Sequence, residues 1–175
     1  MKIRKPQPLK AFDRQCLTKK MVIFFDFDGV FTDNYVYVDE NGIESVRCSR
    51  QDGIGLSKLK SLEVDLFVVS TENNPVVRKR CEKLDIEAHY GVKDKYRVIS
   101  EILVENYDEP VVSILVGNDE NDITASHAVN VTICVLDALP AFKEVADYIT
   151  SKKGGRGAVR EICDFLSENY WGYQK

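Results

Sequence analysis

The sequence predicts a three-layer α/β fold with a mainly parallel sheet. Short, mostly apolar runs occur at residues 21–25, 64–69, 111–116 and 131–135, as expected for strands buried on both faces. Stretches with apolar residues at helical spacing separate these runs, and such alternation favours strands joined by helical crossovers. We therefore expect a Rossmann-like architecture. A dinucleotide-binding protein is the weaker alternative, because no G-x-G-x-x-G sequence is present.

The composition indicates one soluble domain. At 175 residues, with 44% hydrophobic and 30% charged residues, the chain can bury one sizeable core. A net charge of -4 argues against a general nucleic-acid binder, and no apolar stretch is long enough to span a membrane. The cysteines are dispersed without paired spacing, which favours reduced thiols and a cytoplasmic location over disulfides or a zinc site. They are Cys16, Cys48, Cys81, Cys134 and Cys163.

Residues 1–20 are predicted to form a basic N-terminal arm ahead of a domain that spans residues 21–175. The arm is rich in Lys and Arg and has a single acid, Asp13. Pro6 and Pro8 argue against an early helix, so we expect a loose, solvated tail with a short helix near residues 9–16. A translation start at Met21 and the remnant of an upstream fused domain are the alternatives.

Two carboxylates follow the first apolar run. Asp26 and Asp28 come at the carboxyl end of the strand expected at Met21–Phe25, where unpaired buried charge is unfavourable. Residues two apart in an extended segment point the same way, so both carboxylates can bind one hard cation such as Mg²⁺. Gly29 lets the backbone turn and a ligand approach closely. For an isolated D-x-D pair, a strand capped by a polar turn is the alternative.

The longer string DFDGVFTD resembles the first motif of the haloacid dehalogenase superfamily of phosphatases. It is most similar to the phosphatases of 3-deoxy-octulosonate 8-phosphate and of nonulosonate 9-phosphates, and to the phosphatase-like domain of some acylneuraminate cytidylyltransferases. The resemblance does not include residues 1–20. It implies that residues 21–175 form a haloacid dehalogenase-like phosphatase domain. In that domain Asp26 is the nucleophile, Asp28 is the general acid and base, and both bind Mg²⁺.

A β-hairpin is expected next in the chain. Residues 34–38 and 43–48 are extended, β-branched or aromatic runs on either side of an Asn-Gly turn. Tyr35 and Tyr37 give the hairpin an apolar face, and an exposed apolar face of this kind marks an interface. In the family that the chain resembles, a projecting hairpin takes the place of a cap domain and builds a homotetramer.

A helix is expected at residues 54–62, and the sequence leaves two roles open for the residues before it. Asp52 is a plausible N-cap for this helix. The resemblance implies instead that Asp52 and Gly53 lie at the mouth of the site and contact the substrate.

Two hydroxyls follow the second apolar run. Ser70 and Thr71 precede a helix expected at residues 76–84, and a hydroxyl near a helix N-terminus suits a phosphate oxygen. The resemblance implies that Ser70 binds the phosphate and that Thr71 is a neighbouring substrate contact. A simple helix cap is the alternative for Ser70.

Lys95 comes just before a helix expected at residues 96–106. It aligns with the catalytic lysine of the family, which pairs with the aspartyl phosphate. Lys93 is interpreted as an ordinary surface charge. His89 and His127 are isolated in the sequence, and their spacing does not indicate metal binding.

Three acids crowd the turn after the third apolar run, in the sequence GNDEND at residues 117–122. Strand ends of this kind are where α/β proteins build their sites, and a solvated acidic loop is the alternative. The turn resembles the G-D-x-x-x-D metal motif of the family, with Asn118 in place of the first Asp and Asp122 as the second. Asn118 keeps an oxygen for Mg²⁺ but lacks the charge, which predicts weaker Mg²⁺ binding.

The rest of the chain continues the alternation of strands and helices. We expect a short strand and turn at residues 88–91, a helix at 123–128, a strand at 131–135, a helix beginning near Pro140, an edge strand at Tyr148–Ile149 and a helix at Ala158–Asn169. The sequence GGRGAVRE before the last helix closely resembles the tail of the octulosonate phosphatases. The resemblance implies that Arg156 contacts an anionic substrate, in its own or a neighbouring subunit. A solvated charge at a helix start is the alternative.

The resemblance therefore implies a Mg²⁺-dependent phosphomonoesterase that hydrolyses a phosphorylated keto sugar acid through an aspartyl phosphate. Nothing in the spacing selects between the octulosonate and nonulosonate substrates. The alternative is a weakly active or inactive oligomerisation module of the kind linked to acylneuraminate cytidylyltransferase. Such modules tend to lose the nucleophile, so the intact Asp26 favours the enzyme, while Asn118 keeps the alternative open.

Overall fold

A parallel sheet forms the centre of the protein. The computed structural model describes residues 5–13 and 17–170. Within these residues the sheet has seven strands in the order β1-β9-β8-β7-β2-β5-β6, and all neighbours pair in parallel. The strands of this sheet are β1 (Gln7–Pro8), β2 (Met21–Phe25), β5 (Asp65–Val69), β6 (Glu87–His89), β7 (Val112–Gly117), β8 (Val131–Cys134) and β9 (Tyr148–Ile149).

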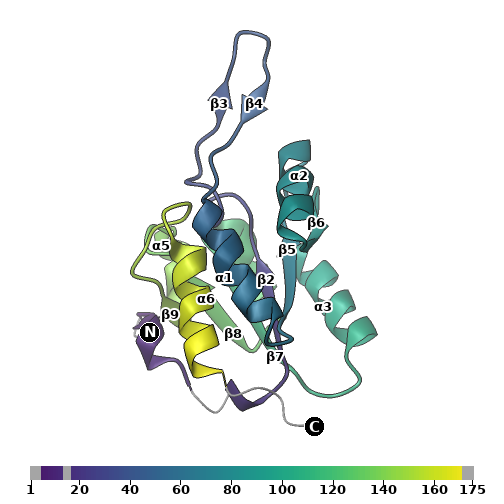
Figure 1. The fold of residues 1–175 in the computed structure, drawn as a ribbon, viewed down its shortest axis with the longest axis vertical. Helices are drawn as coiled ribbons and strands as arrows, with labels where there is room; N and C mark the ends of the chain where they lie inside the picture. Colours follow the sequence, from purple (N-terminus) through teal and green to yellow (C-terminus); the bar gives the residue numbers. More distant parts are fainter. Residues whose placement is uncertain (1–4, 14–16, 171–175) are drawn as a thin grey trace.

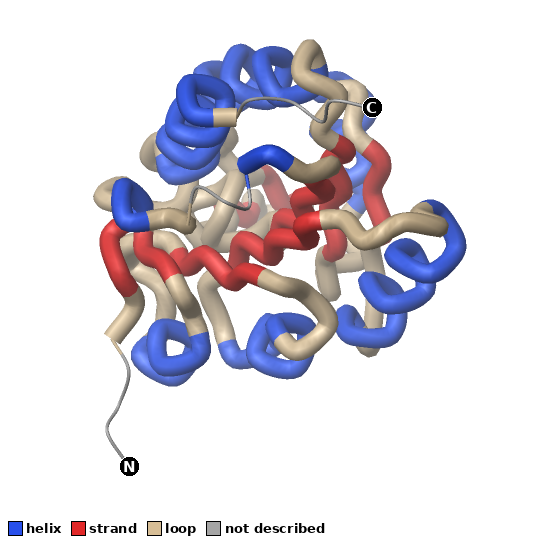
Figure 2. The backbone as a smooth tube through the Cα atoms, turned by 90° about the horizontal axis from the view of Figure 1, so that it is seen from below, coloured by secondary structure: helices blue, strands red, loops and turns tan. Residues whose placement is uncertain are grey.

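Helices cover both faces of the sheet, as Figure 2 shows. They are α1 (Arg50–Lys60), α2 (Pro75–Leu84), α3 (Lys95–Asn106), α4 (Ile123–Ser126), α5 (Pro140–Val145) and α6 (Ala158–Asn169). Helices α1 and α6 pack against each other in front of the sheet in Figure 1, and α4 packs on α3 and α5. The predicted three-layer α/β fold is thereby confirmed. None of the helices in the described residues is long and apolar enough to cross a membrane.

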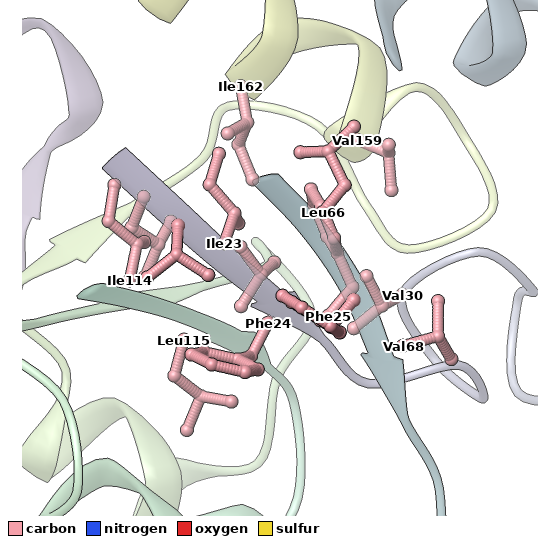
Figure 3. Packing of buried hydrophobic residues seen from close by; sticks show 14 of the residues in the cluster. Ile23, Phe24, Phe25, Val30, Leu66, Val68, Ile114, Leu115, Val159 and Ile162 are labelled. Atoms are coloured by element: carbon pink, nitrogen blue, oxygen red, sulfur yellow. The ribbon is translucent and has the colours of Figure 1, made fainter. Parts of the chain in front are cut away.

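Strand β2 lies in the middle of the core, between β5 and β7, and all its residues are buried. Phe24 stacks on Phe67 of β5 with ring centroids 5.4 Å apart, and Phe25 meets Phe31 edge-on at 5.5 Å. Figure 3 shows side chains of the neighbouring strands and of α6 gathered around β2. Because each such side chain stabilises the fold by about 1.5–3 kcal/mol when fully buried, this packing holds the end of β2 in place.

Part of the predicted N-terminal arm packs on the domain. Strand β1 pairs with β9, Leu9 and Phe12 are buried, and the Phe12 ring lies 4.9 Å from that of Tyr148. The prediction of a loose, solvated tail is therefore wrong for these residues. Strand β9 is also not an edge strand, because β1 covers its outer side.

The helix predicted near residues 9–16 is only partly described. A short 3-10 helix is present at Leu9–Ala11. Residues 14–16 and residues 1–4 of the arm lie outside the described residues, as does Cys16. The domain boundary after residue 20 stays a prediction.

The predicted hairpin is present and projects away from the sheet, at the top of Figure 1. Its antiparallel strands are β3 (Tyr37–Val38) and β4 (Glu44–Ser45). The Asp39 carboxylate closes the turn by accepting hydrogen bonds from the backbone N–H groups of Asn41 and Ile43. Tyr35 is 74% exposed and Tyr37 is 61% exposed, so the apolar face of the hairpin is uncovered. Its role as an interface stays a prediction.

Candidate active site

Several predicted residues line a small hollow at the carboxyl ends of three neighbouring strands. The hollow has a volume of about 190 Å³, and we call it the acidic hollow. Its lining residues follow β2 (Asp26, Asp28, Asn34), β5 (Ser70, Thr71, Glu72) and β7 (Asn118, Asp119, Asn121). Parallel strands bring their carboxyl ends to one edge of the sheet, which is why residues so distant in the sequence meet here.

Lys95, at the start of α3, forms buried ion pairs with two predicted residues. Its Nζ lies 2.7 Å from Asp26 Oδ1 and 2.7 Å from Asp122 Oδ1. Burial and the nearby Asp122 raise the pKa of Asp26 to about 7, against the lowering effect of Lys95. Burial lowers the pKa of Lys95, but Asp26 and Asp122 outweigh it and raise that pKa above its usual range. The lysine therefore keeps its proton and its positive charge beside Asp26.

The turn after β2 orients Asp28. Thr32 Oγ1 donates to Asp28 Oδ1 at 3.0 Å and accepts from the backbone N–H groups of Gly29 and Asn34. Burial raises the pKa of Asp28. Gly29 has a φ of 77°, and a Cβ at this position would overlap the side-chain amide of Asn118. Glycine is therefore required here both by the backbone conformation and by the close approach of Asn118.

The donor atoms around Asp26 fit a hard divalent cation. Asp26, Asp28 and Asp122 supply three carboxylates against the single ammonium of Lys95. Asn118 Oδ1 is buried and has no hydrogen-bond partner among the described residues, which is unfavourable for an amide oxygen that no ligand contacts. Oxygen donors of this kind are those that Mg²⁺ prefers.

Asn118 is the one amide among the predicted metal ligands. No group of three His, Cys, Asp or Glu side chains that could hold a metal ion is present in the described part of the chain. Asp122 is already engaged, because its Oδ1 accepts from Lys95 and its Oδ2 accepts from the backbone N–H of Asn118 at 2.9 Å. The metal-binding roles of these residues stay predictions.

Ser70 and Thr71 differ in their surroundings. Ser70 is buried, and its Oγ accepts a hydrogen bond from the backbone N–H of Glu72 at 3.2 Å. Thr71 is exposed, and its Oγ1 accepts from Asn121 Nδ2 at 3.3 Å. Because a hydroxyl that accepts a bond can still donate one, Ser70 can donate to a phosphate oxygen in the acidic hollow.

The Gly-rich loop packs on the turn after β2. The backbone N–H of Gly155 donates to the Val30 carbonyl at 2.9 Å, and a Cβ on Gly154 would overlap the Gly29 carbonyl. This approach brings Arg156 next to the turn, with its guanidinium 3.3 Å from Asp33 Oδ2. Arg156 lines a separate hollow of about 480 Å³, which we call the arginine hollow. Its contact with an anionic substrate stays a prediction.

Asp52 and Gly53 lie in the first turn of α1 and are not among the residues that line the acidic hollow. Ser49 is the N-cap of α1, since its side chain accepts from the Gln51 N–H at 3.1 Å, so the prediction of an Asp52 cap is wrong. Asp52 is buried without a hydrogen-bond partner for its carboxylate among the described residues. Burial raises the pKa of Asp52 to about 6. The substrate contacts of Asp52 and Gly53 stay predictions.

Known proteins of one family match most of this chain, although no family model matches it. The 3-deoxy-D-manno-octulosonate 8-phosphate phosphatase KdsC of Escherichia coli K12 is 32% identical over 146 residues, which cover 83% of this chain and 78% of that protein. This chain belongs to the KdsC-like family of the haloacid dehalogenase superfamily. The predicted family is thereby confirmed, and the chain is a phosphomonoesterase of the haloacid dehalogenase type.

Solved structures of KdsC-like phosphatases share the fold. The enzyme of Moraxella catarrhalis, in complex with a magnesium ion, a phosphate ion and a KDO molecule, has a TM-score of 0.83 and 27% identity, covering 89% of this chain and 90% of that one. The cobalt-bound enzyme of Haemophilus influenzae has a TM-score of 0.81 and 27% identity, covering 89% of this chain and 92% of that one.

Four residues of the acidic hollow in this KdsC-like chain were not among the site residues predicted from the sequence. They are Asn34, Glu72, Asp119 and Asn121. Glu72, Asp119 and Asn121 are polar and follow a buried strand within a few residues, so their distance from the strand end is the signal that could have identified them. Asn34 lies well beyond the end of β2 at Phe25 and has no such signal. The close approach of the Gly-rich loop to the turn after β2 was also not predicted, because nothing in the sequence indicates which loops meet.

Proposed function

We propose that this protein is a Mg²⁺-dependent phosphatase of a phosphorylated keto sugar acid, either 3-deoxy-octulosonate 8-phosphate or a nonulosonate 9-phosphate. The observation that carries the proposal is the buried arrangement of Asp26 between Lys95 and the open hollow, with the ion-pair distance of 2.7 Å. The names of the KdsC relatives, and the Moraxella catarrhalis complex with magnesium, phosphate and KDO, support the substrate and the metal.

Asp26, Asp28, Asn118 and Asp122 would hold the Mg²⁺ ion. When bound, this ion supplies positive charge beside the phosphate oxygens, which a dianionic phosphate ester requires before a nucleophile can approach. Lys95 adds a fixed positive charge from the protein side, and the Ser70 hydroxyl donates to a phosphate oxygen.

Asp26 then attacks phosphorus and forms an aspartyl phosphate, while the sugar alkoxide leaves. Asp28 protonates that alkoxide and afterwards removes a proton from the water that hydrolyses the aspartyl phosphate. Burial raises the pKa of Asp28, which favours a carboxyl group that holds a proton for the leaving group. Thr32 keeps this group aimed at the hollow through its hydrogen bond to Asp28 Oδ1.

A phosphate-release screen tests the proposed function. The protein with Mg²⁺ is expected to release phosphate faster from 3-deoxy-octulosonate 8-phosphate or a nonulosonate 9-phosphate than from glucose 6-phosphate at equal concentration. The two sugar-acid substrates, compared directly, decide between the eight- and nine-carbon classes. Absence of release from every substrate would favour the alternative, an inactive oligomerisation module, which the uncharged Asn118 leaves open.

The Asn118→Asp variant is expected to bind Mg²⁺ more tightly than the wild type. Ligand charge is one of the factors that set affinity for a hard cation, and this change adds a full charge where the orphaned Asn118 Oδ1 lies. We expect the Mg²⁺ concentration for half-maximal activity to fall several-fold. An Asn106→Asp variant, which adds the same charge at an exposed position at the end of α3, is the control. Coincident Mg²⁺ titrations of wild type and Asn118→Asp would mean that residue 118 does not bind the metal.

We propose that the hairpin joins four copies of the chain. The proposal rests on the exposed apolar face of the hairpin, which projects from the domain. On this face Tyr37 is 61% exposed and Ile43 is 65% exposed. Light scattering at micromolar concentration is expected to give the mass of a tetramer for the wild type and a smaller mass for Tyr37→Asp. Val104→Asp, at a 79% exposed position on α3, is expected to keep the tetramer mass. A monomeric wild type would rule out the assembly.

A further inference from the structure

Asp33 lies where the turn after β2 leads into the hairpin, and its carboxylate pairs with two arginines. Asp33 Oδ2 is 2.5 Å from Arg47 Nη2 and 3.3 Å from Arg156 Nη2. Arg47 follows β4, on the side of the hairpin that returns to the domain, and Arg156 belongs to the Gly-rich loop. One side chain therefore ties together the turn after β2, the base of the hairpin and the Gly-rich loop.

The surroundings of the Asp33 carboxylate distinguish it from an ordinary surface ion pair. The Asp33 side chain is 12% exposed, whereas those of Arg47 and Arg156 are about half exposed. Asp33 Oδ1 is buried and has no hydrogen-bond partner among the described residues, which is unfavourable for a carboxylate oxygen. Ion pairs with exposed arginines add little to stability. The stability of the fold therefore does not account for an aspartate at this position.

The backbone next to Asp33 connects it to Asp28. Thr32 is fully buried and donates a hydrogen bond to Asp28 Oδ1 at 3.0 Å. The Gly-rich loop packs tightly on the same stretch, because a Cβ on Gly155 would lie 2.5 Å from the backbone nitrogen of Asp33. A shift of Asp33 would therefore move Thr32, and with it the hydrogen bond that orients Asp28.

We propose that Asp33 is a positioning residue for the acid and base chemistry and that it acts on Asp28 through Thr32. Its two arginine contacts fix the turn after β2, so that the Asp28 carboxyl group meets the oxygen of the leaving group. The proposal rests on the proposed function, because it takes Asp28 as the general acid. It assigns no contact between Asp33 and the substrate. A misplacement of about 1 Å at such a group can lower the rate about a hundredfold.

Two phosphate esters with different leaving groups test the proposal. Benzyl phosphate releases an alkoxide, which needs a proton as it leaves, whereas p-nitrophenyl phosphate releases a stabilised anion that does not. Neither ester has a carboxylate or a sugar hydroxyl, so lost contacts with a sugar acid do not enter the comparison. The measurement is kcat/KM of the full chain with Mg²⁺, because it reports the steps up to the transfer of the phosphoryl group to Asp26.

Asp33→Ala is expected to lower kcat/KM at least about tenfold for benzyl phosphate and no more than about twofold for p-nitrophenyl phosphate. Asp33→Asn, which keeps the size and one acceptor oxygen, should show the same difference between the esters to a smaller degree, as should Arg47→Met. The ratio of the two kcat/KM values does not depend on the fraction of enzyme that is folded, so a partly misfolded variant still decides the matter. Equal losses for both esters in Asp33→Ala would mean a purely structural role and would overturn the proposal.

A double variant tests whether Asp33 acts through Asp28. Asp28→Asn is expected to show the larger difference between the esters, and adding Asp33→Ala should lower kcat/KM for benzyl phosphate no further, because residues that act through one group are not additive. Additive losses would overturn the proposal. If Asp28→Asn affected both esters equally, the general-acid role of Asp28 in the proposed function would fail, and the positioning role with it. A difference in Asp28→Asn that is absent in Asp33→Ala would overturn the positioning role alone.

Asp164→Asn is the matched control. Asp164 on α6 also pairs with two cations, since its carboxylate lies 2.7 Å from Lys58 Nζ and 2.7 Å from Arg160 Nε. It does not line the acidic hollow, so the ratio of the two kcat/KM values should equal that of the wild type. A change of the ratio in Asp164→Asn as large as in Asp33→Ala would show a general effect of losing such a pair and would overturn the proposal.

Discussion

Asp26→Asn is expected to reduce phosphate release at least about a thousandfold, which is the scale of loss when a nucleophile is removed. The amide keeps the shape of the carboxyl group at the end of β2 but cannot attack phosphorus. The fold should persist, because the core around β2 does not depend on the carboxylate and the Asp26 backbone N–H still donates to the Val116 carbonyl at 2.9 Å. Phosphate release over a range of enzyme concentrations, together with thermal unfolding, measures both effects.

The control for Asp26→Asn is Asp85→Asn. Asp85 has a side chain that is 93% exposed, so the same chemical change there should leave turnover unchanged. If Asp26→Asn turned over substrate at near the wild-type rate, Asp26 would not be the nucleophile, and the assignment of the whole acidic hollow would fail with it.

Lys95→Met is expected to abolish activity and to destabilise the fold. The Lys95 ammonium lies 2.7 Å from both Asp26 and Asp122, and all three groups are buried. Removing one partner from a buried ionic network leaves uncompensated charge, at a cost of about 3–5 kcal/mol in the free energy of unfolding. Denaturant unfolding without Mg²⁺ measures the loss, because bound metal would otherwise offset part of the missing charge.

A double variant keeps this prediction decisive if Lys95→Met folds poorly. In Lys95→Met the carboxylates of Asp26 and Asp122 lose their ion-pair partner. Adding Asp26→Asn removes one of these two charges, so the double variant should regain part of the lost stability, as expected for residues in one network. Lys79→Met, at a side chain that is 66% exposed, should change neither activity nor stability measurably. Equal stability of Lys95→Met and the wild type would contradict the buried ion pairs.

Much of the site follows from the pattern of strands in the sequence. The positions of Asp26, Ser70 and Asn118 at strand ends were predictable, because a buried parallel strand leaves a clear apolar run and its polar residues then gather at one edge. The position of Lys95 depended on the family resemblance, since its sequence neighbours do not distinguish a buried lysine from the exposed Lys93. Only the fold reveals the pairing of Lys95 with two acids.

Other features could not be predicted because they depend on contacts between distant segments. Strand β1 is two residues long and includes Pro8, so it has no periodic signal of its own. The choice of Ser49 over Asp52 as the N-cap depends on which side chain reaches the Gln51 N–H, and both residue types suit that role. The hydrogen bond between Asn121 and Thr71 joins two loops that follow different strands. Only the order of the strands in the sheet brings these loops together.

The central claim is that phosphate passes through a covalent bond to Asp26. Acid quench during turnover of the sugar-acid phosphate with Mg²⁺, followed by mass spectrometry of the peptides, measures this directly. We expect a phosphoryl group on the peptide that contains Asp26, with release by hydroxylamine, as an acyl phosphate requires, and no such group in Asp26→Asn. Turnover by the wild type with a phosphoryl group on a different residue, or with none on Asp26 under the same quench, would contradict the account.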